Sequence, residues 1–124
     1  MADLKSAERL LIGTRPLTDI AGFHCQQAAE KVLKAYLTWH EVVFPKTHSL
    51  VALIALCLEL ETKFETLRFA AITLTPYAVA SRYPGGLTNL SSEEAAKALV
   101  LANQVWKFIL ARIPDTLSTR FTSG

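Results

Sequence analysis

The sequence predicts an all-α protein, an antiparallel up-and-down four-helix bundle with one short additional helix. Three observations support this prediction. Alanine and leucine, which favour helices, together supply 36 of the 124 residues. Glycine and proline, five of each, fall mostly between segments whose apolar residues recur every three or four positions. The connections between these segments are short, which favours antiparallel neighbours.

Two helices are predicted in the N-terminal third of the chain. The first covers residues 3–12 and stops at Gly13. The second covers residues 17–40 and has two faces. The apolar face carries Cys25, Ala28, Ala29, Val32, Leu33, Ala35, Tyr36 and Trp39, and the polar face carries His24, Gln26, Gln27, Glu30, Lys31, Lys34 and Thr38. Phe23 lies within the polar face, which predicts that another helix, a second subunit or a ligand covers part of it.

The third helix is predicted over residues 48–60. Thr47 or Ser49 provides its N-cap. Because this segment is apolar nearly all round and too short to cross a bilayer, we expect it to be buried between neighbouring helices.

The fourth and fifth helices each follow a capping-box pattern. Thr62 and Glu65 predict a helix that begins near residue 63 and continues to residue 81, with a kink or short break at Pro76. Ser91 with Glu94 predicts the fifth helix, residues 93–113. A packing seam runs along the fifth helix through Ala96, Leu99, Asn103, Trp106, Leu110 and Ile113. The tail, residues 115–124, is expected to be flexible.

Composition and charge exclude several classes of protein. Hydrophobic residues make up 51% of the chain and charged residues 19%, which excludes a mainly disordered protein and indicates a single domain over residues 1–124. The net charge is only +2, with no run of three basic residues, and this argues against binding nucleic acid through charge alone. The surplus of apolar residues predicts a partner, and a second copy of the chain is a candidate.

Cysteine usage and the missing motifs limit the location and the chemistry. Cys25 and Cys57 lie in apolar helical patterns, without a CxxC motif or a zinc-ligand spacing, and are interpreted as buried thiols of a reducing compartment. Neither a signal peptide nor a membrane span is recognisable, so we expect a soluble, cytoplasmic protein. Phosphate-loop, dinucleotide, HExxH and EF-hand patterns are absent from the sequence, so no cofactor and no metal are expected.

Three blocks of sequence together carry a family resemblance. They are Phe23-His24-Cys25-Gln26-Gln27-Ala28-Ala29-Glu30-Lys31, Pro45-Lys46-Thr47-His48-Ser49-Leu50 and Ser81-Arg82-Tyr83-Pro84-Gly85. In combination, and over nearly the whole chain, they resemble the HEPN domain family. The resemblance implies an all-α up-and-down bundle, nucleotide binding, and frequent action beside a minimal nucleotidyltransferase.

The resemblance also raises the question of ribonuclease activity. Many toxin members of that family are metal-independent ribonucleases with an Arg-x4-6-His motif, in which the arginine steadies phosphate charge and the histidine moves a proton. In this sequence Arg82 is followed by Tyr-Pro-Gly-Gly-Leu-Thr, and Arg15 precedes His24 with eight residues between them. Because the Arg-x4-6-His motif is missing, the sequence favours a protein without this ribonuclease activity.

The candidate binding residues lie in the three blocks. They are His24, Gln27, Lys31, His48, Arg82 and Tyr83. His24, Gln27 and Lys31 lie on one polar face of the second helix. Either this face offers hydrogen-bond donors to a phosphate or to the edge of a base, or it is only exposed to water. His48 is a base, a phosphate contact or part of a helix cap. Arg82 either meets a phosphate or caps helix carbonyls while Tyr83 packs.

The sequence therefore predicts a binding module for a nucleotide, a nucleotidyltransferase partner or both, in a toxin-antitoxin-like pair and without catalysis of its own. One alternative is a toxin-like ribonuclease that uses Arg82 with His24 or His48. Another is a structural homo-oligomer, with two-fold pairing through the second or the fifth helix.

Overall fold

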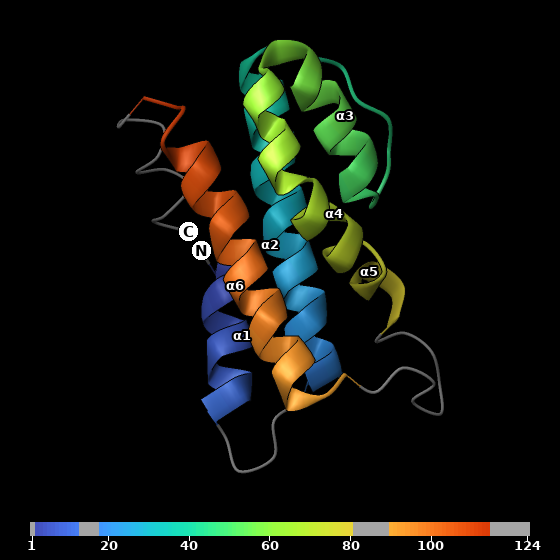
Figure 1. Cartoon of the computed structure of the whole chain (residues 1–124), viewed down its shortest axis with the longest axis vertical. Coiled ribbons are helices and arrows are strands. Elements are labelled where there is room, and N and C mark those ends of the chain that lie inside the picture. Colours follow the sequence, from blue (N-terminus) through green and yellow to red (C-terminus); the bar gives the residue numbers. More distant parts are fainter. Residues whose placement is uncertain (1, 13–17, 81–89, 115–124) are drawn as a thin grey trace.

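Helix α2 (Thr18–Trp39) is the centre of the molecule, and the other helices pack around it (Figure 1). The computed structural model describes residues 2–12, 18–80 and 90–114. The remaining helices are α1 (Ala2–Ile12), α3 (Leu50–Leu60), the 3₁₀ helix η1 (Thr62–Leu67), α4 (Arg68–Leu74), α5 (Tyr77–Ala80) and α6 (Ser92–Leu110). These ranges contain no strand, which confirms the predicted all-α helical bundle. The predicted flexible tail lies outside the described residues.

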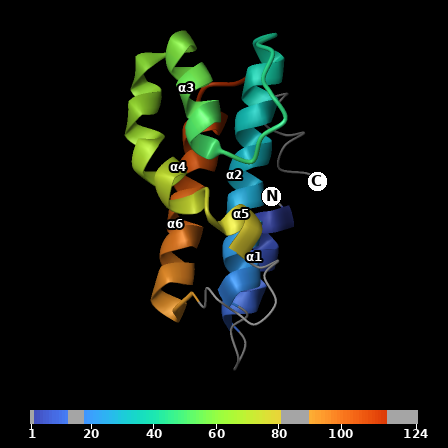
Figure 2. The same cartoon turned by 90° about the vertical axis from the view of Figure 1, so that its right-hand side faces the viewer.

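The helices do not simply alternate in direction along the chain (Figures 1 and 2). Helix α1 runs against α2, whereas α6 runs with it, since Trp106 bonds to Ala28 and Leu90 to Asp19. Helix α3 also runs with α2, where the short-connection argument predicts an antiparallel neighbour. The physical reason is that the segment 41–49 is long enough to return along α2 before α3 begins.

The caps of α3 and α6 agree with the sequence patterns. The Ser49 hydroxyl accepts a hydrogen bond from the backbone N–H of Ala52 at the start of α3. Ser91 and Glu94 form the predicted reciprocal capping box at the start of α6. These bonds satisfy backbone donors that have no partner within their own helices.

The capping box predicted at residues 62–65 is wrong. The residue before η1 is Glu61, which makes no side-chain cap, and α4 begins only at Arg68. The Glu65 carboxylate is held instead by the Arg68 guanidinium, at 2.6 and 3.0 Å. The predicted break at Pro76 is confirmed, because α4 ends at Leu74 and α5 starts after a two-residue turn.

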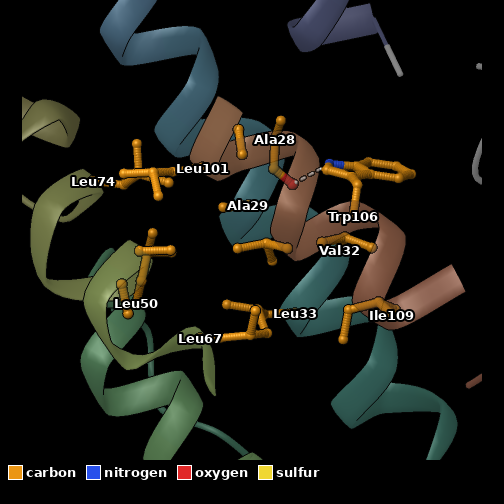
Figure 3. Close-up of a cluster of buried hydrophobic side chains, with 14 of the residues drawn as sticks. Ala28, Ala29, Val32, Leu33, Leu50, Leu67, Leu74, Leu101, Trp106 and Ile109 are labelled. Atoms are coloured by element: carbon orange, nitrogen blue, oxygen red, sulfur yellow. Dashed lines mark hydrogen bonds between the residues drawn. The ribbon is translucent and has the colours of Figure 1, made fainter. Parts of the chain in front are cut away.

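The core is built on one face of α2 (Figure 3). Leucines from α2, α3, η1 and α4 meet there, and the Trp106 indole N–H donates to the Ala28 carbonyl oxygen at 2.9 Å. The predicted apolar face of α2 is buried as expected, except that Ala35 is half-buried and Trp39 is exposed. On the predicted polar face, Gln26 and Glu30 are buried, so part of this face is covered.

The two cysteines are expected to be unreactive in the folded protein. Cys25 and Cys57 are buried, and burial raises the pKa of each thiol to about 12. Because the thiolate is the reactive species, a disulfide reagent at about pH 8 should label neither thiol in the native state and both after denaturation. Colorimetric thiol counting checks this. A thiol that reacts fully within minutes without denaturant would contradict the packing described.

Within the described ranges, no helix has the length and apolarity needed to cross a membrane.

Candidate functional site

Five polar side chains form one hydrogen-bonded network on α2 and at the start of α3, which we name the Glu30 cluster. Its members are Gln26, Gln27, Glu30, Lys34 and His48. The Glu30 carboxylate is the centre. Its Oε1 atom accepts from Gln26 Nε2 at 3.0 Å and lies 2.8 Å from His48 Nδ1, while its Oε2 atom accepts from Lys34 Nζ at 3.2 Å.

Gln26 ties the cluster to the backbone. Its amide nitrogen donates to the backbone carbonyl of His48 at 3.0 Å as well as to Glu30, and its amide oxygen accepts from Gln27 at 2.7 Å. The side chain is fully buried, so each of these bonds replaces one that water would have made. The bond from Gln26 to the chain at residue 48 fixes where the segment 41–49 returns to α2.

Local structure around residue 48 holds the histidine in place. The backbone N–H of Ser49 donates to the Thr47 hydroxyl at 3.0 Å, and Ser49 itself caps α3. The backbone N–H of Leu50 donates to the Thr75 hydroxyl at the end of α4, also at 3.0 Å. His48 is therefore positioned from α2, α3 and α4 together.

Glu30 is ionised although it is buried. Burial by itself raises the pKa of this carboxyl group, but the hydrogen bonds from Gln26, His48 and Lys34 outweigh burial and place the pKa below its ordinary value. A carboxylate can only accept hydrogen bonds, so the Nδ1 atom of His48 must carry the proton that it shares with Glu30. In the neutral ring, Nε2 is then a hydrogen-bond acceptor.

The outer side of the cluster is accessible. The His48 side chain is 56% exposed, and no described residue hydrogen-bonds to its Nε2 atom. The Lys34 ammonium group lies 5.8 Å from the centre of the Phe44 ring, on the segment 41–49. It has three donors, of which one is used by Glu30. The imidazole and the ammonium group are thus both held by Glu30, and the aromatic ring lies next to the ammonium group.

A second polar cluster joins α1 to α2. The Asp3 carboxylate contacts His24 Nδ1 at 2.9 Å and accepts from Lys31 Nζ at 2.7 Å. These bonds cross between two antiparallel helices, so they hold α1 in place. His24 also packs its ring edge against Phe23, with centroids 5.8 Å apart.

The predicted polar face therefore divides into two parts. Gln27 and His48 belong to the Glu30 cluster, whereas His24 and Lys31 are held by Asp3. Arg82 and Tyr83 lie outside the described residues, so their relation to His48 stays a prediction. Asn103 donates to the Leu99 carbonyl oxygen within its own helix.

The sequence reasoning missed the two carboxylates that organise these clusters. Glu30 was counted only as one residue of the polar face, and Asp3 was not singled out. One signal was present, since Gln26, Glu30 and Lys34 follow at four-residue steps and such residues are neighbours on a helix surface. Burial of that row depends on the segment 41–49 passing over it, which spacing alone does not reveal.

Acid is expected to destabilise the protein through both carboxylates. Burial raises the pKa of Asp3, but the bonds from Lys31 and His24 outweigh it, so the pKa values of Asp3 and Glu30 lie below their ordinary values of 3.8 and 4.5. A carboxyl group of this kind stabilises the fold above its ordinary pKa, and the contribution is lost as pH falls through the native pKa. The unfolding free energy should therefore decline below about pH 4.5.

Urea unfolding at a series of pH values measures this decline. The double variant Asp3→Asn, Glu30→Gln should show a shallower acid limb, because neither replacement binds a proton in this range. An acid limb of unchanged slope in the double variant would assign the effect to other groups.

The described residues contain no group of three or more metal-ligating side chains, so neither cluster has the ligands of a metal centre. Comparison with known proteins gives one match. The family model of the HEPN domain matches residues 1–113. Neither the curated proteins nor the solved structures yield a match.

Proposed function

Because the chain belongs to the HEPN domain family, we propose that it is a cytoplasmic binding module without catalysis of its own, which takes a nucleotide at the Glu30 cluster. We also propose that it works beside a nucleotidyltransferase in a toxin-antitoxin-like pair, as the family resemblance implies. The observation that carries the binding proposal is the Glu30–His48 hydrogen bond, in which a buried carboxylate holds an exposed imidazole at one orientation.

A nucleotide offers groups that match those on the outer side of the cluster. The Lys34 ammonium group has donors left for phosphate oxygens, and a phosphate there adds negative charge next to a cation. The Nε2 atom of His48 accepts from a ribose hydroxyl or a base amine. The Phe44 ring, half-buried beside Lys34, provides an apolar surface for the base or sugar.

Thermal unfolding with a panel of nucleotides tests the proposal. A nucleotide at a hundred times its Kd stabilises the native state by about 2.7 kcal/mol, which raises the Tm of a chain this size by roughly 10 °C. His48→Ala and Lys34→Gln should each reduce the shift. His40→Ala is the matched control, because His40 is an exposed histidine that packs on Tyr36 and Trp39, away from the cluster.

Two results would contradict the proposal. One is the absence of a shift with every nucleotide at millimolar concentration. The other is a shift that His48→Ala and Lys34→Gln leave at its wild-type size, which would place the site elsewhere. Adding Arg82→Ala to the series tests whether the third sequence block contributes to the same site.

The Glu30–His48 pair also favours one alternative, a metal-independent ribonuclease that uses His48 with Arg82. A histidine whose Nδ1 proton is held by a carboxylate is oriented for proton transfer at Nε2. Under this alternative, RNA cleavage by the purified protein falls at least about tenfold in Glu30→Gln and further in His48→Ala. Cleavage that survives both substitutions would come from a contaminant.

A further inference from the structure

The two glutamines of the Glu30 cluster have side-chain amides whose orientation is fixed by hydrogen bonds. The chain of bonds starts at Glu30, whose carboxylate pairs with Lys34 and can only accept hydrogen bonds. Gln26 therefore turns its amide nitrogen to Glu30 Oε1 and to the backbone carbonyl oxygen of His48, which is also an acceptor. The amide oxygen of Gln26 is left facing Gln27.

Gln27 is the last amide in this chain of bonds. Its Nε2 atom donates to the Gln26 amide oxygen at 2.7 Å. If the Gln27 amide turned over, two amide oxygens would meet without a proton between them. If both amides turned over, the Gln26 oxygen would face the Glu30 carboxylate and the His48 carbonyl. A glutamine in water presents its amide either way round, whereas Gln27 presents it in one way only.

The part of the Gln27 amide that the cluster does not use is one acceptor and one donor. A side-chain amide has two N–H donors and a carbonyl oxygen, and Gln26 takes only one of the donors. Among the described residues, none hydrogen-bonds to the Gln27 Oε1 atom, and the residue is half-buried, so part of it reaches solvent. Gln27 thus offers a fixed oxygen acceptor beside a fixed N–H donor.

Gln27 lies on the side of α2 that carries the proposed phosphate contact. Gln27, Glu30 and Lys34 follow at steps of three and four residues, so they are neighbours on the helix surface. A ligand whose phosphate meets Lys34 can therefore place its base at Gln27 along the same side of the helix. His48, held by Glu30, adds a further outward acceptor at Nε2.

The acceptor and donor of Gln27 are complementary to one kind of base edge. In adenine and in cytosine an exocyclic amine, a donor, stands beside an unprotonated ring nitrogen, an acceptor. The amine donates to Gln27 Oε1 while Gln27 Nε2 donates to the ring nitrogen, which is the bidentate contact that glutamine makes with adenine. In hypoxanthine and uracil a carbonyl oxygen stands beside a ring N–H, so donor and acceptor are exchanged and both contacts are lost.

We propose that Gln27 is the specificity-determining residue of the nucleotide site, and that the site takes a nucleotide whose base carries an amine beside an unprotonated ring nitrogen. Gln26 is the positioning residue, since it is fully buried and fixes the Gln27 amide through one hydrogen bond. The inference rests on the proposed nucleotide site at the Glu30 cluster and adds the class of base that this site accepts.

Two pairs of nucleoside monophosphates test the assignment by isothermal titration calorimetry. Adenosine and inosine monophosphate differ only at this edge of the purine, and cytidine and uridine monophosphate differ only at the same edge of the pyrimidine. Within a pair, the amino base should bind to the wild type with a Kd at least about tenfold lower, as expected for one bidentate contact. The pair that shows this difference at the lower Kd distinguishes adenine from cytosine as the preferred base.

Two substitutions on α2 separate reading of the base from binding in general. Gln27→Met removes the amide, so the amino nucleotide should lose about tenfold in affinity while its keto partner is unchanged. Gln26→Met keeps the Gln27 amide but frees it to turn over, so the keto nucleotide should bind more tightly than it does to the wild type. A purely structural role of Gln26 would weaken both nucleotides alike.

Gln104→Met is the matched control, because Gln104 is an exposed glutamine on α6 and the same substitution there should leave the ratio of the two Kd values unchanged. Circular dichroism checks that each variant is folded. Because Gln27 is only half-buried, Gln27→Met keeps the test decisive even where Gln26→Met does not fold.

Two results would overturn the proposal and leave the nucleotide site in place. One is an equal Kd within both pairs, since the site would then bind nucleotides without reading the amine. The other is a preference for the amino base that Gln27→Met leaves intact, since another residue would then read the base. If none of the four nucleotides binds, the proposed function fails and this inference fails with it, so the two failures are distinguishable.

Discussion

Replacing Phe64 by alanine is expected to lower the free energy of unfolding by about 3–5 kcal/mol, because it empties the space of a fully buried ring. Phe64 lies in η1, where its ring packs against Tyr36 of α2 at 5.1 Å and Phe108 of α6 at 4.8 Å between centroids. One side chain thus joins three helices, and the neighbouring rings cannot close the cavity without moving their backbones.

Urea unfolding followed by circular dichroism measures the loss. Phe69→Ala is the matched control, since Phe69 is the same residue type on the adjacent helix but 58% exposed, and its cost should stay near 0.5 kcal/mol. Equal costs for the two variants would mean that η1 does not pack as described.

Replacing Glu30 by alanine is expected to cost about 1–3 kcal/mol, the cost of leaving buried polar groups without a partner. The substitution removes the acceptor for Gln26, Lys34 and His48 at once. Lys34 and His48 reach solvent, so the cost falls mainly on the fully buried Gln26. The freed imidazole should also lose its fixed orientation, and nucleotide binding at the cluster should weaken with it.

Two measurements check this result. Chemical denaturation gives the stability change, with Glu59→Ala as the control, because Glu59 is exposed on α3 and should cost less than about 0.5 kcal/mol. Nuclear magnetic resonance of the histidine ring nitrogens reports the proton on His48 Nδ1, which should exchange with water faster in Glu30→Ala. An unchanged exchange rate would contradict the hydrogen bond between the two side chains.

Most of the helical architecture could be predicted from residue spacing and caps. Three features follow from residue types and their spacing within a short stretch of sequence. They are the apolar face of α2, the caps at Ser49 and Ser91, and the break at Pro76. The errors occurred where a distant or competing contact decides the outcome. Thr62 is not the cap because η1 begins one residue earlier than expected, with Glu61 at the N-cap position, and Glu65 binds Arg68 instead. Helix α3 runs parallel to α2 because the segment 41–49 returns along α2.

The candidate site was predicted only in part, for a similar reason. His48 and Gln27 were singled out as candidates and lie in one cluster, but the carboxylate at its centre was counted only as one residue of the polar face. Glu30 is buried because the segment 41–49 returns along α2 and covers it. The bonds from Asp3 to His24 and Lys31 connect α1 with α2. Contacts between residues eighteen or more positions apart follow from topology, which local patterns do not determine.

The bond from Trp106 to Ala28 has a consequence for how the chain folds. It joins residues 78 positions apart, and the bond from Leu90 to Asp19 spans 71 positions. The central helix is therefore made well before α6, the helix that packs against its apolar face. Until α6 leaves the ribosome, the nascent chain exposes Ala28, Val32 and their neighbours to water, which is the condition under which chains aggregate or recruit chaperones. Closure of the bundle therefore has to wait for the synthesis of α6.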